Sequence, residues 1–182
     1  MSETRNQLKS IAVERIQKEN LAASSFREMG KAAGIKSSSV HYHFKSRDAL
    51  LLELAQDFKR DFFDALQRKT GEISSPKQRL QHLFMLYADF YQSHELTLAL
   101  AYQANAHELT DECREVIQAF HNELNTWVLD SLQPARFLPI SKESLALVVS
   151  SSLQGALMMD RGQGAAEHLD AVQEWLASLS SL

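Results

Sequence analysis

Residues Ser25–Arg47 read SFREMGKAAGIKSSSVHYHFKSR, and this stretch determines how the rest of the chain is interpreted. It contains two short helical patterns separated by a glycine, Gly34. Ser25 and Glu28 form an S-x-x-E capping box, in which each side chain satisfies a free amide of the first helical turn. The stretch therefore predicts two helices joined by a glycine turn, the second over residues 37–44.

Apolar and polar residues of this hairpin fall on opposite faces at helical spacing. The apolar set can clamp the two helices together and comprises Phe26, Met29, Ala33, Ile35, Val40 and Phe44. The polar set offers hydroxyls, imidazoles, a phenol and cations, which suits a helix-turn-helix whose second helix enters the major groove. The candidate DNA contacts are Ser25, Arg27, Lys36, Ser37, Ser38, Ser39, His41, Tyr42, His43, Lys45 and Arg47.

Charge is distributed unevenly along the 182 residues. Residues 1–47 hold nine Lys/Arg and four Asp/Glu, a balance of +5, and residues 48–182 hold ten and nineteen, a balance of −9. A basic head on an acidic body indicates that the head alone faces a polyanion. The alternative is a plain helical hairpin with a solvated face, whose serines are ordinary caps and whose histidines have no task.

Composition and periodicity favour an all-α globular protein. Hydrophobic residues make up 45% of the chain and recur at three- and four-residue steps, and we find no strand alternation. About nine helices are predicted, over residues 4–19, 25–33, 37–44, 46–69, 76–92, 94–108, 111–132, 141–161 and 165–179. Asn20 is expected to end the first helix in the left-handed conformation.

Several function classes are disfavoured. No apolar run is long enough to span a membrane, and the polar N-terminus lacks a signal region. The single cysteine, Cys113, excludes an internal disulfide and is expected to be a buried, inert thiol in a reducing cytoplasm. No H-E-x-x-H, G-x-S-x-G or phosphate-binding glycine loop is present, so we expect no enzyme, metal or cofactor.

The stretch Ser25–Arg47 resembles the DNA-binding core of the tetracycline-repressor (TetR) family of bacterial regulators. The family pattern is roughly T-hydrophobic-R-x-I-A-x-x-A-G-V-S-x-x-x-L-Y-x-H-F-x-S-K-x-x-L. The residues at matching steps are Ser25, Phe26, Arg27, Met29, Gly30, Ala33, Gly34, Ile35, Val40, Tyr42, His43, Phe44, Lys45, Ser46, Arg47 and Leu50. The resemblance covers about the first 55 residues; the remainder is similar in length and helical character alone.

Three positions depart from the family pattern. Gly30 replaces an alanine, which is expected to weaken its helix by about 1 kcal/mol. Lys36 replaces a capping serine, so either Ser37 caps the helix or the added cation contacts phosphate. His41 replaces a tyrosine that is often used against the DNA backbone, and a neutral histidine still donates one hydrogen bond.

The resemblance implies a helix-turn-helix domain at residues 1–47 and a ligand-binding and dimerisation domain at 48–182, joined by a helix at 48–69. It implies a homodimer whose two recognition helices lie about 34–36 Å apart on DNA. In the family the last two helices form the dimer surface, and the alternative is packing within one chain. The dimer candidates are Val148, Val149, Ser152, Gly155, Ala156, Leu169, Val172 and Leu176.

A third set of residues, between the head and the dimer helices, could line a small-molecule cavity, because such sites combine aromatic walls with a few polar groups. The candidates with polar ends on apolar faces are Tyr87, Tyr91, Tyr102, Asn105 and Trp127. Ordinary core packing is the alternative. We interpret the chain as a dimeric repressor that binds a pseudo-palindromic operator and is released by a small effector. A constitutive DNA-binding regulator, or a helical interaction module or enzyme, are the rival interpretations.

Overall fold

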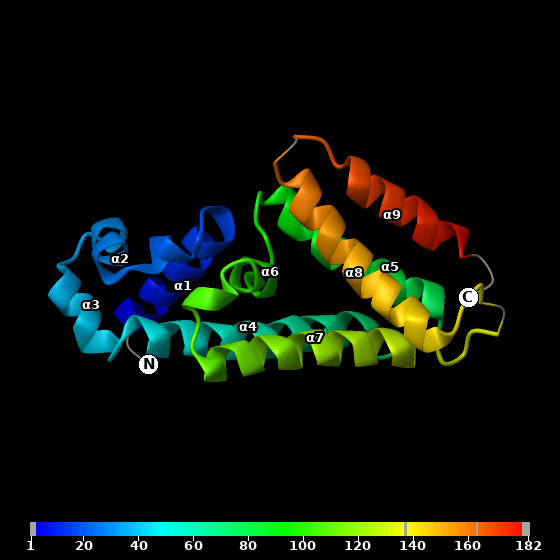
Figure 1. The fold of residues 1–182 in the computed structure, drawn as a ribbon, viewed down its shortest axis with the longest axis horizontal. Coiled ribbons are helices and arrows are strands. Elements are labelled where there is room, and N and C mark those ends of the chain that lie inside the picture. Colours follow the sequence, from blue (N-terminus) through cyan, green and yellow to red (C-terminus); the bar gives the residue numbers. More distant parts are fainter. Residues whose placement is uncertain (1–2, 137, 163, 180–182) are drawn as a thin grey trace. The chain divides into compact units, whose positions relative to one another are not determined.

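The computed structural model describes residues 3–136, 138–162 and 164–179. Over these residues the chain forms nine α-helices and two 3₁₀ helices without any strand, which confirms the all-α prediction (Figure 1). No helix in the described ranges combines the length and apolar character needed to cross a membrane. The elements are α1 (Glu3–Lys18), η1 (Leu21–Ser24), α2 (Phe26–Ala33), α3 (Ser37–His43), α4 (Arg47–Thr70), α5 (Pro76–Gln92), α6 (Leu98–Gln103), η2 (Ala106–Glu108), α7 (Asp111–Leu132), α8 (Lys142–Asp160) and α9 (Glu167–Ser178).

Helix starts follow the capping residues of the sequence. The hydroxyls of Ser25, Ser46 and Ser75 each accept a hydrogen bond from the amide three residues later, at 3.3, 3.0 and 3.4 Å. Pro76 occupies the first turn of α5, where its missing N–H removes no helical bond. The helices predicted over 76–92 and 111–132 occur with these bounds.

Two local predictions were wrong. Asn20 is extended, with φ −171° and ψ 176°, and precedes η1 instead of ending α1 in a left-handed conformation. The single helix predicted over 94–108 is divided into α6 and η2. His94 has a left-handed φ of 57°, and the Thr97 hydroxyl accepts from the Leu100 amide at 3.2 Å, so the helix begins only after Thr97.

Contacts divide the chain into two compact units, residues 1–60 with 95–118 and residues 61–94 with 119–182. The first unit packs α1, α2 and α3 with the start of α4 and the segment around α6. Gln17 ties α1 to this segment, because its backbone oxygen accepts from the Leu96 amide at 3.1 Å and its side chain donates to the Leu96 oxygen at 2.7 Å. The Tyr102 hydroxyl donates to the Leu51 oxygen at 3.0 Å, which joins α6 to α4.

The second unit packs α5, α8 and α9 against one another, as Figure 1 shows. Its core includes Leu83, Tyr87, Phe120, Val149 and Leu153, all buried. The buried Asp160 at the end of α8 caps α9 from outside that helix: its carboxylate accepts from the amides of His168 and Leu169 at 3.0 and 2.7 Å. These amide bonds lower the pKa of Asp160 against the opposing effect of its burial.

Candidate nucleic-acid interface

The turn between α2 and α3 depends on two glycines. Gly34 has φ 69° and ψ 25°, a left-handed conformation that closes α2. Gly30 lies against the next segment: the Ile35 amide donates to the Gly30 oxygen at 2.9 Å. A Cβ at Gly30 would lie 2.8 Å from the Ile35 oxygen and 3.2 Å from the Ser37 nitrogen. The glycine therefore permits the close approach of α3, which is the structural reason for its departure from alanine.

The apolar clamp is present beneath α3. Phe26, Met29, Val40 and Phe44 are buried, and Ala33 and Ile35 are half-buried. The Phe26 ring lies 4.6 Å edge-on from the His41 ring and 6.5 Å from the Phe44 ring, between centroids. The clamp fixes α3 on a rigid base and leaves its other side to the solvent.

The solvent face of α3 carries the predicted polar residues. Tyr42 is 87% exposed, the largest exposed apolar side chain near this face. Ser38, Ser39, His41, Arg27, Lys36 and Lys45 are exposed, and Ser25, Ser37 and His43 are half-buried. Lys31 of α2 is also exposed and adds a cation that the sequence argument did not include. Most of the predicted contact residues are therefore accessible to solvent.

The cap of α3 differs from one expectation. Lys36 is the cap residue, its side chain makes no capping bond, and Ser37 is already helical, so the suggestion that Ser37 caps this helix was wrong. The reason is geometric: Lys36 is extended, with φ −70° and ψ 145°, and occupies the last non-helical position. The second option, in which the Lys36 cation contacts phosphate, stays a prediction.

Arg47 has structural partners that the sequence does not indicate. Its guanidinium donates to the Leu21 oxygen at 2.8 Å and the Ser24 hydroxyl at 3.2 Å, and it pairs with Glu108 at 3.3 Å. Arg47 therefore joins the first turn of α4 to η1 and η2 within the first unit. These bonds use several of its five donors, which leaves Lys45 as the better phosphate candidate of the two.

An ion cluster holds α1 against α4. Arg5 donates to both oxygens of Glu53, at 2.7 Å to Oε1, and Lys9 pairs with Glu53 at 2.9 Å and with Asp57. The Arg5 guanidinium also lies 4.8 Å from the centre of the Phe44 ring. The hydrogen bond from Arg5 and the cation of Lys9 lower the pKa of Glu53 to about 2, against desolvation. No local motif could reveal this cluster, because its partners are 44 to 48 residues apart.

The candidate ligand residues divide between the two units. In the second unit Tyr87 is fully buried, Tyr91 and Trp127 are half-buried, and the Arg79 guanidinium lies 4.8 Å from the centre of the Trp127 ring. Tyr87 and Phe62 lie 6.4 Å apart, and Phe62 and Phe120 5.1 Å, between centroids. The Tyr87 hydroxyl is buried without a hydrogen-bond partner in the described residues, and burial raises its pKa.

In the first unit Tyr102 and Asn105 are engaged in local bonds. Besides the Tyr102 bond to Leu51, the Asn105 amide donates to the Ala101 oxygen at 2.9 Å. Tyr102 also lines a pocket of about 150 Å³. Its other lining residues are Gln103, Ala106, Leu109, Arg114, Ile117 and Gln118. Arg114 is held by the Ala106 and Leu109 oxygens and by Asp111, so its charge is already compensated there.

The candidate dimer residues lie at different depths. Val149, Ala156, Leu169 and Leu176 are buried within the chain, Val148 and Gly155 are exposed, and Ser152 and Val172 are half-buried. The outward face of α8 instead carries exposed apolar side chains at Leu147, Val148, Met158 and Met159. Residues 147, 151, 155, 158 and 159 recur at three- and four-residue steps, a helical face that the sequence argument did not separate from the core face.

Cys113 is buried, as expected, and burial raises the pKa of its thiol to about 11. This keeps the thiol protonated and unreactive near neutral pH. Within the described ranges, no group of three His, Cys, Asp or Glu side chains is placed to hold a metal ion.

A short solvent-facing helix on an apolar clamp, entered through a glycine turn, defines a helix-turn-helix protein. The sequence pattern of "Bacterial regulatory proteins, tetR family" matches residues 10–54. Over these residues the chain is similar to the DNA-binding region of TetR-family regulators.

Two repressors share sequence with the chain. It is 30% identical over 107 residues to the HTH-type transcriptional repressor KstR2 of Mycolicibacterium smegmatis. This alignment covers 59% of this chain and 52% of that protein. The chain is 28% identical over 110 residues to KstR2 of Mycobacterium tuberculosis H37Rv, covering 60% and 54%. The matched part spans about half the length of these relatives.

Solved structures share the whole fold. A TetR transcriptional regulator from Legionella pneumophila superposes with a TM-score of 0.88 at 22% identity, over 98% of both chains. The ketosteroid transcriptional regulator KstR2 of Mycobacterium tuberculosis superposes with a TM-score of 0.73 at 22% identity, over 97% of this chain and 93% of that one. At these identities the comparison establishes the fold of the described helices.

Proposed function

We propose that the chain is a transcriptional repressor that binds a pseudo-palindromic DNA operator as a homodimer and leaves it when a small effector binds. The observation that carries the proposal is the solvent face of α3, where Tyr42 and a row of hydroxyls and imidazoles project from a buried clamp. Such a helix can offer hydrogen-bond donors to base edges and phosphates without moving its base. The family pattern over residues 10–54 and the similarity of the chain to HTH-type repressors support this function.

The DNA-binding role is tested with a duplex selected from a random library by the wild-type protein. We expect Tyr42→Ala to weaken binding at least about tenfold, because it removes a contact at the centre of the exposed face. Lys45→Ala is expected to weaken binding to all duplexes by a similar factor. It should also reduce the slope of log K against log salt concentration by about 1. Fluorescence anisotropy over a salt series measures both effects.

Lys142→Ala is the matched control, since Lys142 belongs to the second unit and is remote in sequence from the hairpin. It should bind DNA as the wild type does. Selection that enriches no duplex, or a Tyr42→Ala protein with wild-type affinity, would rule out DNA binding through α3. Circular dichroism of each variant verifies that the helices are retained.

An effector role is supported by Tyr87. A buried hydroxyl without a partner costs about 1–3 kcal/mol, and a ligand with one hydrogen-bonding group would recover that cost. The Phe62 ring beside Tyr87, and the Phe120 ring beside Phe62, favour a ligand with an apolar body. For release from DNA, the ligand must prefer a conformation in which the two α3 helices no longer fit successive grooves.

A thermal-shift screen of the full chain separates this function from a constitutive regulator, because a ligand of the folded state raises the melting temperature by mass action. Hydrophobic metabolites and cationic compounds form two arms of the screen. Ketosteroids form a third, because KstR2, which has a similar fold, is described as a ketosteroid regulator. A compound that raises the melting temperature must also release the selected duplex; compounds that bind the folded chain and leave the duplex bound would contradict effector-driven release.

A further inference from the structure

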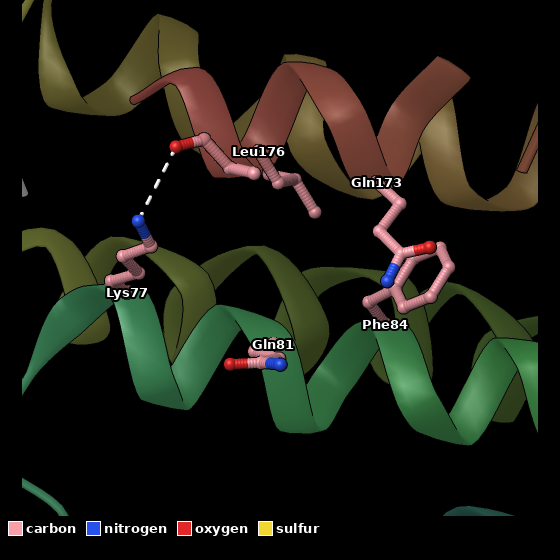
Figure 2. A pocket seen from close by; sticks show the side chains of 6 residues that line it. Lys77, Gln81, Phe84, Gln173 and Leu176 are labelled. Carbon is pink, nitrogen blue, oxygen red and sulfur yellow. Dashed lines mark hydrogen bonds between the residues drawn. The ribbon is translucent and has the colours of Figure 1, made fainter. Parts of the chain in front are cut away.

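A groove lies between α5 and α9 in the second unit, away in sequence from the DNA-binding hairpin (Figure 2). It encloses about 100 Å³. Lys77, Gln81 and Phe84 line it from α5 at positions i, i+4 and i+7, and Gln173, Leu176 and Ala177 line it from α9. These spacings place each set along one helix face, so the groove follows the line where the two helices meet.

The floor and walls of the groove differ in chemistry. Phe84 and Leu176 are largely buried and supply apolar surface at the base. Gln81 and Gln173 are exposed, and their amides have no partner among the described residues. Figure 2 shows the Gln173 amide beside the Phe84 ring, with Gln81 between Phe84 and Lys77. An apolar ligand body with polar edges could therefore lie along this line.

One end of the groove is cationic. The Lys77 ammonium makes one long hydrogen bond, 3.4 Å to the Ala177 oxygen in the last turn of α9, which leaves two of its three donors for another acceptor. Lys77 belongs to the first turn of α5, where the helix dipole adds positive potential, and its contact with Ala177 uses one carbonyl of the negative end of α9. Among the six lining residues, Lys77 is the one charged group, so no lining carboxylate competes for it.

We propose that this groove binds a small amphipathic carboxylate, with its apolar part over Phe84 and Leu176 and its carboxylate on Lys77. One ring or a short alkyl chain suits the volume. A carboxylate fits better than a phosphate, because a single ammonium faces the groove and the floor is apolar. A ligand here would bridge α5 and α9. The site is separate from the buried Tyr87 and does not depend on the proposed function.

The test uses the full-length chain labelled with ¹⁵N and benzoate as the probe. The side-chain amide signals of Gln81 and Gln173 are assigned from the variants Gln81→Met and Gln173→Met. We expect benzoate to shift both signals saturably, with a dissociation constant on the order of 1 mM, as suits a fragment of this size. Benzamide, which has the same shape without the charge, should bind about fivefold more weakly.

Two variants locate the site. Lys77→Met is expected to lower the affinity for benzoate about fivefold, since it removes the charge-assisted contact. The affinity for benzamide should not change. Ala177→Phe fills the groove from an exposed position and should abolish the shifts at both glutamines. Lys142→Met is the matched control, because Lys142 also donates to a backbone oxygen, that of Gln133 at 2.6 Å, outside the groove.

Each of these results tests carboxylate binding in the groove independently of DNA binding. The proposal is overturned if benzoate shifts neither glutamine signal at concentrations up to tens of millimolar, roughly ten times the expected dissociation constant. It is also overturned by equal affinity for wild type and Lys77→Met, which would indicate an apolar surface without carboxylate recognition. If Ala177→Phe does not fold, the wild-type amide shifts and Lys77→Met still decide the question.

Discussion

At the scale of single residues, Tyr87 bears on both stability and the proposed effector binding. Its ring packs in the core of the second unit, and its hydroxyl has no hydrogen-bond partner among the described residues. A buried polar atom without a partner destabilises the folded state unless something else uses it. The same atom is therefore a structural cost in the ligand-free protein and the expected contact for an effector.

Replacing Tyr87 with phenylalanine separates these two roles. Tyr87→Phe is expected to leave the free energy of unfolding unchanged or to raise it by about 1 kcal/mol, because the unpaired hydroxyl disappears and the ring remains. The same variant should lose affinity for any effector found in the thermal-shift screen. Urea unfolding and ligand titration measure the two effects. A destabilisation of about 2 kcal/mol would show that the hydroxyl has a partner in solution.

At the scale of elements, the position of the hairpin depends on contacts that α1 and α4 make. Arg5 and Lys9 of α1 form ion pairs with Glu53 of α4. Arg47 at the start of α4 forms a hydrogen bond with η1 and an ion pair with η2. Because α3 leads directly into α4, these bonds fix the element that follows the proposed recognition helix. The hairpin is thus built locally but oriented by side chains outside it.

The ion cluster predicts a pH dependence. Its contacts lower the pKa of Glu53 from 4.5 to about 2, so its contribution to stability is complete above about pH 4.5 and is lost as the pH falls toward 2. Glu53→Gln should cost about 1 kcal/mol at pH 7 and flatten the loss of stability between about pH 4.5 and 2. Urea unfolding at several pH values measures both.

Glu14→Gln is the control for this experiment. Glu14 also pairs with a lysine, Lys18 at 2.9 Å, but within one helix and on the exposed surface. Such pairs contribute little, so the variant should keep the wild-type pH profile. If Glu53→Gln and Glu14→Gln gave the same profile, the cluster would not stabilise the contact between α1 and α4.

At the scale of the whole molecule, the proposed dimer needs an apolar surface that one chain leaves uncovered. The outward face of α8 meets this need at Leu147, Val148, Met158 and Met159, with Gly155 between them to allow close approach. The inward residues Val149 and Leu153 are already used in the core of their own chain. We therefore propose the outward face as the dimer surface.

A charge on this face should dissociate the dimer. Met158→Glu is expected to weaken dimerisation at least about tenfold, because two-fold symmetry places the substitution in the interface twice. Sedimentation equilibrium measures the change. Met85→Glu is the matched control: Met85 on α5 is 42% exposed and Met158 is 41% exposed, and the control should remain dimeric. Dissociation by the control alone would move the interface to α5.

Much of the helix-turn-helix could be predicted from the sequence because its signals are local. The Ser25 hydroxyl accepts from the Glu28 amide as predicted, whereas the Ser25 amide donates to the Ala22 oxygen instead of completing the predicted capping box. Gly34 closes the turn, and the clamp residues recur at helical steps. The caps at Ser46 and Ser75 likewise lie three residues from the amides they satisfy. The residues in these interactions are neighbours in the sequence. Both the helices and the polar face of α3 could therefore be predicted from local sequence patterns.

The sequence by itself therefore determined an all-α chain whose short third helix is exposed on its polar face. Tertiary structure alone decided the division of residues 94–108, the structural use of Arg47, the ion cluster at Glu53 and the outward face of α8. The physical reason is separation along the chain: the partners of Arg5, Arg47 and Gln17 lie 48, 61 and 79 residues away. Sequence periodicity shows which side chains share one face of a helix. Only the tertiary packing shows whether that face contacts the core, another helix or solvent.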